Sequence, residues 1–257
     1  MNQSTKIIIG AAAVVIVGGG IYAATTGQKK SDAETHKGAK LGLVLDTGGV
    51  DDHSFNQSAW EGAKAYAKAN NMKSGQNAPV TYFTTADHSD LDQNFNLATK
   101  NKKYNIVYGI GYSLNQAITK SAQLNPKQNF VLVDDIVTNR PNVASVMFRS
   151  EQSSYLAGVA AATKAKENGE KTLGFIGGIH GNIIDAFDAG FEAGVKATDP
   201  TLKVEKQYAN SFTDSAKGKT IAATMYASGI KTIFAAAGFV GNGAFSEAKA
   251  ENTKLTA

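Results

Sequence analysis

Short apolar runs alternate with stretches of helical periodicity along most of this chain, and this alternation constrains the fold more than any other feature. The apolar runs predict eight β-strands, at Leu41–Asp46, Val80–Thr85, Asn105–Ile110, Phe130–Asp135, Val143–Phe148, Thr172–Gly178, Leu202–Tyr208 and Thr232–Gly238. Helical patterns fill most of the gaps, at residues 54–70, 90–103, 113–125, 152–168, 184–197 and 216–228. Apolar strands joined by helical crossovers predict an α/β fold, in which parallel sheets carry helices on both faces.

One connection breaks the alternation. Only IVTNRPN, which has no helical pattern, stands between Phe130–Asp135 and Val143–Phe148. The 217 residues from 41 to 257, with eight strands, suit two α/β lobes better than one barrel, and such a break is where a chain can pass between lobes. We therefore predict an N-terminal lobe at 41–148 and a C-terminal lobe at 149–257.

The first 40 residues have a different character. Ile7–Ala24 is a run of eighteen residues without a charge, at the lower edge of what spans a bilayer and longer than the usual apolar part of a signal peptide. Residues 1–24 are predicted to form a signal or membrane anchor, and the polar residues 25–40 a tether. Cleavage after the apolar run and retention in the membrane both remain open. The protein is predicted to work outside the cytoplasm, associated with the cell membrane.

Composition excludes several classes of function. The chain has a formal net charge of +4, but Lys6, Lys29 and Lys30 lie in the first 30 residues without any acid, which leaves +1 for residues 31–257. Residues 31–257 are nearly neutral and therefore lack the basic surface that is typical of a protein that binds nucleic acid. The absence of cysteine excludes thiolate metal sites, cysteine nucleophiles and lipid attachment through a thioether.

Polar and glycine residues follow several of the predicted strands. In parallel α/β sheets ligands bind beyond the carboxyl ends of the strands. The residues at those ends are Asp46 to Gly49, Gly109 with Gly111 to Ser113, Asp134 and Asp135, Gly177, Gly178 and His180, and Gly238 with Gly241 to Gly243. Asp46 or Asp134 alone is equally well explained as an N-cap or loop residue. Together, beside aromatic loop residues, they favour a concave polar binding site.

Motifs for covalent chemistry are missing. GIGYSL (Gly109–Leu114) lacks the third glycine of a dinucleotide fingerprint. GFVGNG (Gly238–Gly243) is not followed by Lys-Ser or Lys-Thr and reads as a strand-to-helix turn. No nucleophile elbow occurs, and the four histidines lack metal-ligand spacing. We therefore predict that the protein is not an enzyme and has no catalytic residue, cofactor or metal.

The loop and helix after the first strand read DTGGVDDHSFNQSAWEGAK (Asp46–Lys64). This segment resembles the signature of the basic membrane protein family, the purine nucleoside receptor type of ABC-transporter substrate-binding lipoproteins. Further segments agree in order: Phe130–Asp135, Asn142–Ala162, Gly174–Ala197, Tyr208–Phe234 and Phe245–Ala250. The resemblance covers essentially all of residues 40–250. It implies a type I periplasmic-binding fold whose two lobes close on a nucleoside, with an ABC permease as partner.

The resemblance also implies which residues bind the base. Phe55 and Phe187 match family aromatic residues that sandwich the purine ring, and such stacking supplies affinity with little preference among flat bases. Asn56 and Asp134 match residues that hydrogen-bond the base edges. We prefer Asp134 to its neighbour Asp135 because Asp134 ends the apolar run.

Two more residues are carried over from the family. Asp46 matches an acid near the ligand at the end of the first strand, and Gly238 matches a turn glycine whose backbone lies against the sugar. Trp60 shares the signature, but five residues past the loop it should point away from the cleft. We therefore expect it to be structural.

The chain departs from the family in three ways. The lipobox cysteine is absent, so lipidation cannot anchor it. The glycine turn reads GFVGNG instead of a Gly-Gly-Thr-Gly type of run, and Phe239 adds bulk near the sugar. The chain also ends before a strand and loop that carry an acid and a lysine toward the ribose in the family, which suggests a truncated product or fragment.

Two functions stay open at this point. The first is a monomeric extracytoplasmic protein that binds a purine nucleoside and delivers it to an ABC permease. The second is a membrane-tethered sensor of a nucleoside or other small ligand that has no role in transport. A neighbouring ATPase and permease would favour the first.

Overall fold

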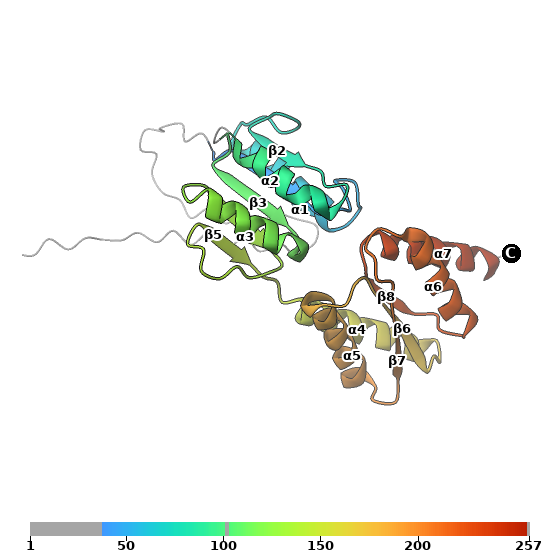
Figure 1. The fold of residues 1–257 in the computed structure, drawn as a ribbon. Coiled ribbons are helices and arrows are strands. Elements are labelled where there is room, and N and C mark those ends of the chain that lie inside the picture. The colour runs from blue at the N-terminus through green and yellow to red at the C-terminus, as the bar shows by residue number, and fades with distance from the viewer. Residues whose placement is uncertain (1–37, 101–102, 256–257) are drawn as a thin grey trace, which may run out of the picture. The chain divides into compact units, whose positions relative to one another are not determined.

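The computed structural model describes residues 38–100 and 103–255. The predicted signal or anchor at residues 1–24, and most of the predicted tether, lie outside these ranges. Within them, two parallel sheets carry helices on both faces (Figure 1). The predicted α/β fold is confirmed, and each of the eight predicted strands is present.

The first sheet and its helices occupy residues 41–146. The elements in chain order are β1 (Leu41–Leu45), α1 (Phe55–Ala69), β2 (Val80–Phe83), η1 (His88–Asp90), α2 (Leu91–Thr99), β3 (Ile106–Ile110), η3 (Tyr112–Leu114), α3 (Asn115–Leu124), β4 (Asn129–Val133) and β5 (Val143–Val146). The strand order is β2-β1-β3-β4-β5, and every neighbouring pair is parallel. The helix predicted at 90–103 corresponds to α2, which ends earlier than expected, at Thr99.

Strand β1 shows how this sheet forms the middle of three layers. Successive side chains of a strand point to opposite faces. Val44 is fully buried in a core that includes Phe95 of α2 and Ile118 of α3. Leu43 lies in a second core with Trp60 of α1. Trp60 is buried and packs edge-on against a tyrosine of β2, so its predicted structural role is confirmed.

The second sheet is built in the same way. Its elements are α4 (Ser150–Glu167), β6 (Thr172–Gly177), α5 (Asn182–Thr198), β7 (Lys203–Tyr208), α6 (Ser215–Ala227), β8 (Ile233–Ala236) and α7 (Phe239–Leu255). The strand order is β7-β6-β8, again all parallel. Phe175 of β6 faces α4 and α5, where it meets Phe191. Ile176, the next residue, faces α6 and α7.

Helices α4 and α5 touch backbone to backbone. A Cβ atom at Gly158 would lie 2.2 Å from the carbonyl oxygen of Phe191. A Cβ atom at Gly190 would lie 2.2 Å from the carbonyl of Glu151, and one at Gly194 would lie 2.1 Å from another carbonyl of α4. Only glycine permits this approach. The two helices therefore form one closely packed pair.

The connection between β4 and β5 contains no helix, as the sequence indicates. The two strands are nevertheless parallel neighbours in the first sheet. The side-chain amide of Asn142 fastens their connection by donating to the carbonyl oxygens of Ala122, Asn125 and Gln128 at 3.0–3.1 Å. The chain changes sheet between Val146 and Thr172. The exact division at residue 149 stays a prediction.

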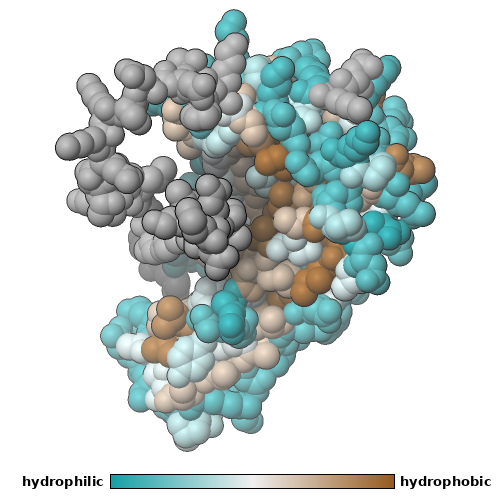
Figure 2. Space-filling model, turned by 90° about the vertical axis from the view of Figure 1, so that its left-hand side faces the viewer, coloured by the Kyte–Doolittle hydropathy of each residue, from teal (hydrophilic) through white to brown (hydrophobic). Residues whose placement is uncertain are grey.

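Figure 2 shows the hydropathy of one face of the described surface. On the face drawn in Figure 2, hydrophobic residues gather in a hollow near the middle, and hydrophilic residues cover most of the outer surface. Among residues 38–100 and 103–255, no helix combines the length and the apolar character needed to cross a membrane.

Candidate functional site

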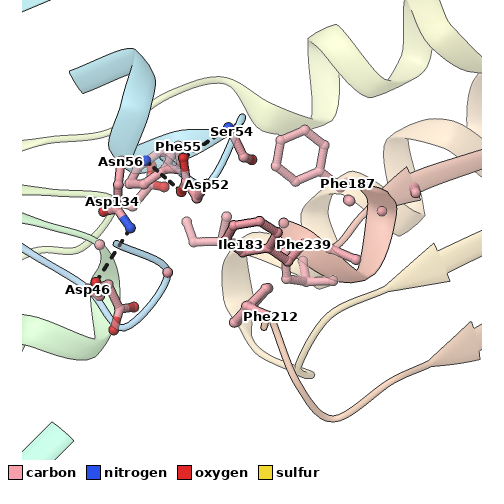
Figure 3. A pocket seen from close by; sticks show the side chains of 18 of the residues that line it. Asp46, Asp52, Ser54, Phe55, Asn56, Asp134, Ile183, Phe187, Phe212 and Phe239 are labelled. Atoms are coloured by element: carbon pink, nitrogen blue, oxygen red, sulfur yellow. Dashed lines mark hydrogen bonds between the residues drawn. The ribbon is translucent and has the colours of Figure 1, made fainter. Parts of the chain in front are cut away.

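A cavity of about 690 Å³ opens beyond the carboxyl ends of β1, β3, β4 and β8. This is the place where parallel α/β sheets bind ligands, and the volume suits a small molecule. The structure brings all six predicted ligand-binding residues to its lining: Asp46, Phe55, Asn56, Asp134, Phe187 and Gly238. In Figure 3 the carboxylates and the amide gather on one side, and rings from the second sheet's helices and loops gather on the other.

The carboxylate of Asp52 holds the loop ahead of α1. It accepts hydrogen bonds at 2.9 Å from the backbone N–H groups of Ser54, Asn56 and Gln57, and the residue is only 5% exposed. Ser54 is the N-cap residue of this helix, but its side chain makes no capping hydrogen bond with the described residues. A carboxylate can satisfy several free N–H groups of a first turn where one hydroxyl cannot.

This arrangement sets the positions of Phe55 and Asn56, the first two residues of α1. The Phe55 side chain is 37% exposed and lines the cavity. Asn56 is buried, with its side-chain Nδ2 pointing at the carbonyl oxygen of Asp46 at 3.5 Å. Its Oδ1 is buried and has no partner in the described part of the chain. Asn56 is thus a lining residue with an unpaired acceptor.

Asp134 supplies a second free acceptor. Its backbone is held in the left-handed region, with φ at 70°, a conformation that aspartate and asparagine tolerate better than other side chains. The side chain is 9% exposed, and its Oδ1 has no partner among the described residues. Burial raises the pKa of Asp134 to about 6.

The neighbouring acid points elsewhere. Asp135 accepts hydrogen bonds from the side chain of Asn115 at 2.7 Å and from the backbone N–H of Ile136 at 2.8 Å. Asp135 is absent from the cavity lining. The structure therefore agrees with the preference for Asp134 over Asp135 as the acid that reaches the site.

Asp46 differs from Asp134 because its carboxylate is already engaged. Oδ1 accepts from the backbone N–H of Thr47 at 2.7 Å and lies 2.9 Å from Nε2 of His88. Oδ2 accepts from the hydroxyl of Ser113 at 2.7 Å. Asp46 thus ties together three segments that follow β1, β2 and β3. Its contact with a ligand stays a prediction.

The aromatic residues Phe55 and Phe187 lie on opposite sides of the cavity in Figure 3. Phe187 belongs to α5 and is half-buried against the core between the second sheet and helices α4 and α5. The hydroxyl of Ser154 in α4 donates to the backbone carbonyl of Phe187. The first residue of α1 and a residue in the second turn of α5 thus present rings to the same cavity.

Gly238 takes the predicted turn conformation, but the turn is shorter than expected. Its φ is 56°, and a Cβ there would lie 2.9 Å from the carbonyl of Phe212. Gly241 and Gly243 belong to α7, which starts directly at Phe239, so the interpretation of GFVGNG as one glycine turn is wrong. A Cβ at Gly243 would lie 1.9 Å from the carbonyl of Ser215, so this glycine serves helix packing.

Several lining residues have no counterpart among the predicted site residues. They include Asp52, Tyr112, Ile183, Phe212, Phe234, Phe245 and Asn242. The rings of Tyr112 and Phe212 meet edge-on, with centroids 6.4 Å apart. Burial, and then the nearby Asp46 carboxylate, raise the pKa of Tyr112. Tyr112 follows a strand and could have been chosen on that signal, whereas Phe212 lies in a loop with no sequence signal for this role.

The described residues offer no cluster of three or more side chains that could hold a metal ion. His53, His88 and His180 are exposed. His88 contacts Asp46, and His180 stacks on Tyr208 with ring centroids 3.4 Å apart. The fourth histidine, His36, lies outside the described residues.

The two parallel sheets and the cavity beyond their strand ends place the protein in the class with a type I periplasmic-binding fold. A solved ABC transporter solute-binding protein from Aeropyrum pernix K1 has this fold and matches with a TM-score of 0.74 at 24% identity, over 83% of this chain and 59% of that chain. The family model of the PnrA-like ABC transporter substrate-binding proteins, Bmp, matches residues 39–256. The chain belongs to this family.

Named relatives are similar over most of the chain. The ABC transporter nucleoside-binding protein BmpA of Lactococcus lactis subsp. cremoris is 46% identical over 231 residues, 90% of this chain. A CD4+ T-cell-stimulating antigen of Listeria innocua is 44% identical over 227 residues, 88% of this chain. The match spans 62% of the length of each of these two relatives.

Proposed function

We propose that this protein captures a purine nucleoside in the 690 Å³ cavity and carries out no covalent chemistry on it. The observation that carries the proposal is the combination of two features in one cavity. Phe55 and Phe187 flank the space from two sides, and the buried Oδ1 atoms of Asn56 and Asp134 have no partner among the described residues. A flat base that presents N–H donors would satisfy both features at once.

The sugar would lie toward the other predicted residues. Gly238 brings backbone close to the cavity because no side chain stands there, and Asp46 lies at the end of β1. The name of the Lactococcus lactis relative, a nucleoside-binding protein, agrees with this class of ligand. A polar cavity lining alone would suit many small molecules, so the paired rings favour a nucleoside over a free sugar.

Titration of the full chain with nucleosides tests this proposal. A ligand that binds only the folded state adds roughly 2.7 kcal/mol to the free energy of unfolding at a hundred times its dissociation constant. We expect guanosine, inosine or adenosine to raise the melting temperature clearly, and ribose at the same concentration to leave it unchanged. Cooperative thermal unfolding whose melting temperature no purine nucleoside raises would contradict the proposal.

We further propose that the protein acts as an exported, membrane-associated monomer that delivers its ligand to an ABC permease. Membership of the ABC transporter substrate-binding family supports this role. Uptake of a labelled purine nucleoside by intact cells should fall when Phe55→Leu and Phe187→Leu are introduced together. Unchanged uptake, with ligand binding lost in the purified variant, would separate binding from delivery and contradict the transport role.

A further inference from the structure

We infer that the charge state of Asp134 selects between two classes of purine, favouring 6-oxopurine nucleosides when the carboxyl is ionised and 6-aminopurine nucleosides when it is protonated. This inference rests on the proposed function of the same cavity. It goes further because it assigns a specificity-determining role to one side chain and a direction to its dependence on pH.

Two residues that line the cavity each carry an unpaired acceptor. Oδ1 of Asn56 and Oδ1 of Asp134 are both buried and have no partner in the described chain, and both residues line the same cavity. Leaving a buried polar atom unpaired destabilises the folded state. A ligand that brings donors to these atoms recovers that cost, and a ligand that brings an acceptor to either of them does not.

The purine bases differ in the hydrogen-bond donors and acceptors that their edges present. Guanine presents N1–H and an exocyclic amine side by side as donors, and hypoxanthine presents N1–H. Adenine presents an amine donor, but its ring N1 is an acceptor and would face the carboxylate without a proton between them. A protonated carboxyl is a donor, so it can bond N1 of adenine while Asn56 accepts from the amine.

The environment of Asp134 lets both charge states occur near neutral pH. Burial alone is the cause of its raised pKa, which lies at about 6. The other titratable or charged groups that line the cavity are Asp46 at the end of β1, Asp52 and His53 ahead of α1, Tyr112 in η3, and Arg149 ahead of α4. Of these, Asp46 and Asp52 have their carboxylates bonded to protein donors, and Arg149 pairs with Glu151.

The backbone supports the same assignment. With φ at 70°, the position of Asp134 is one that aspartate or asparagine adopts more easily than glutamate or a β-branched residue. Asp134→Asn therefore keeps the backbone conformation and the shape while removing the charge. Asp135→Asn is a matched control, because Asp135 is adjacent but does not line the cavity.

The test measures dissociation constants of the full chain for guanosine and adenosine by calorimetry at pH 7.5 and pH 5.0. Neither base changes its own protonation in this range. The dissociation constant for guanosine should rise about tenfold at pH 5.0, because only the ionised fraction of Asp134 then binds it. The dissociation constant for adenosine should fall about tenfold or more. Asp134→Asn should abolish both changes, and Asp135→Asn and His53→Gln should keep them.

A second measurement needs no variant. At pH 6.0, calorimetry in buffers of different ionisation enthalpy should show that guanosine binding releases protons and adenosine binding takes them up. A preference for one purine that stays the same at both pH values, with no proton exchange, would overturn the inference and leave the proposed function standing. Absence of binding by every purine nucleoside at either pH would overturn both.

Discussion

The carboxylate of Asp52 accepts the backbone N–H of Asn56 at 2.9 Å, and this bond fixes the start of α1 at the cavity. The same carboxylate bonds two further N–H groups of that turn. The backbone carbonyl of Asp52 accepts from the side chain of Asn242 in α7 at 3.2 Å. One buried residue therefore supports the segment that presents both a stacking ring and a free acceptor.

Replacement of Asp52 should affect stability and binding together. Asp52→Ala leaves three first-turn N–H groups without their acceptor, so we expect a loss of about 1–2 kcal/mol in the free energy of unfolding, measured in urea. Affinity for a purine nucleoside should also fall. The exposed neighbour gives a matched control, and Asp51→Ala should change neither quantity. Equal effects of the two substitutions would contradict this account.

Loss of either stacking ring should weaken binding with little effect on the fold. Phe55→Leu and Phe187→Leu keep an apolar side chain but remove the ring face, so each should raise the dissociation constant roughly tenfold, in line with about 1–3 kcal/mol per stacked base. Tyr155→Leu on α4, which lies outside this cavity and is 38% exposed, should leave affinity unchanged. Wild-type affinity in both phenylalanine variants would show that the rings only pack against protein.

The raised pKa of Asp134 gives the free chain a defined dependence of stability on pH. Between its ordinary value of 3.8 and its folded value of about 6, the folded state holds a proton that the unfolded state has released. Its contribution therefore favours folding at low pH and is lost as the pH rises through this window. The free energy of unfolding of Asp134→Asn should exceed that of the wild type by about 3 kcal/mol at pH 7.5 and by little at pH 4, measured by urea unfolding.

The control for this prediction is again Asp135, whose carboxylate accepts two hydrogen bonds. Asp135→Asn should not stabilise the chain at pH 7.5. A difference between wild type and Asp134→Asn that is the same at both pH values would indicate that Asp134 is not titrating between them.

Two helical glycines should respond to alanine with opposite signs. Gly190→Ala places a Cβ 2.2 Å from a carbonyl of α4, so the helix pair must separate, and we expect a loss of more than about 2 kcal/mol. Gly62 lies in α1 and is exposed, and no atom of the described residues lies within 4 Å of an added Cβ. Gly62→Ala should therefore stabilise by about 0.5–1 kcal/mol. Thermal unfolding of both variants tests this prediction. Changes of the same sign in the melting temperatures of the two variants would contradict it.

The strands and most helices follow from the sequence because their apolar spacing reflects burial directly. Val44 and Leu43 show this, since one residue of separation sends them to different cores. Helix α7 was missed at its start because glycines at 241 and 243 look like turn residues when their packing partners are unknown. Gly243 meets a carbonyl from α6, a contact that only the folded chain reveals.

The site likewise contains residues that the sequence indicates and residues that it does not. Asp134 was preferable to Asp135 from its place at the end of an apolar run, and the cavity lining agrees with that choice. Asp52 was missed because the local pattern around Ser54 resembles an ordinary N-cap. The partners of Asp52 are backbone groups, and backbone groups carry no signal in a sequence.

The glycine contacts between α4 and α5 have a mechanical consequence for the ring of Phe187. Strand β5 ends at Val146 and helix α4 begins at Ser150, so three residues, 147–149, connect them. Because backbone meets backbone between the two helices, no layer of side chains can yield, and α5 must follow any rotation of α4. A change in the backbone torsions of residues 147–149 would therefore move the ring of Phe187 together with both helices, without a change in its rotamer.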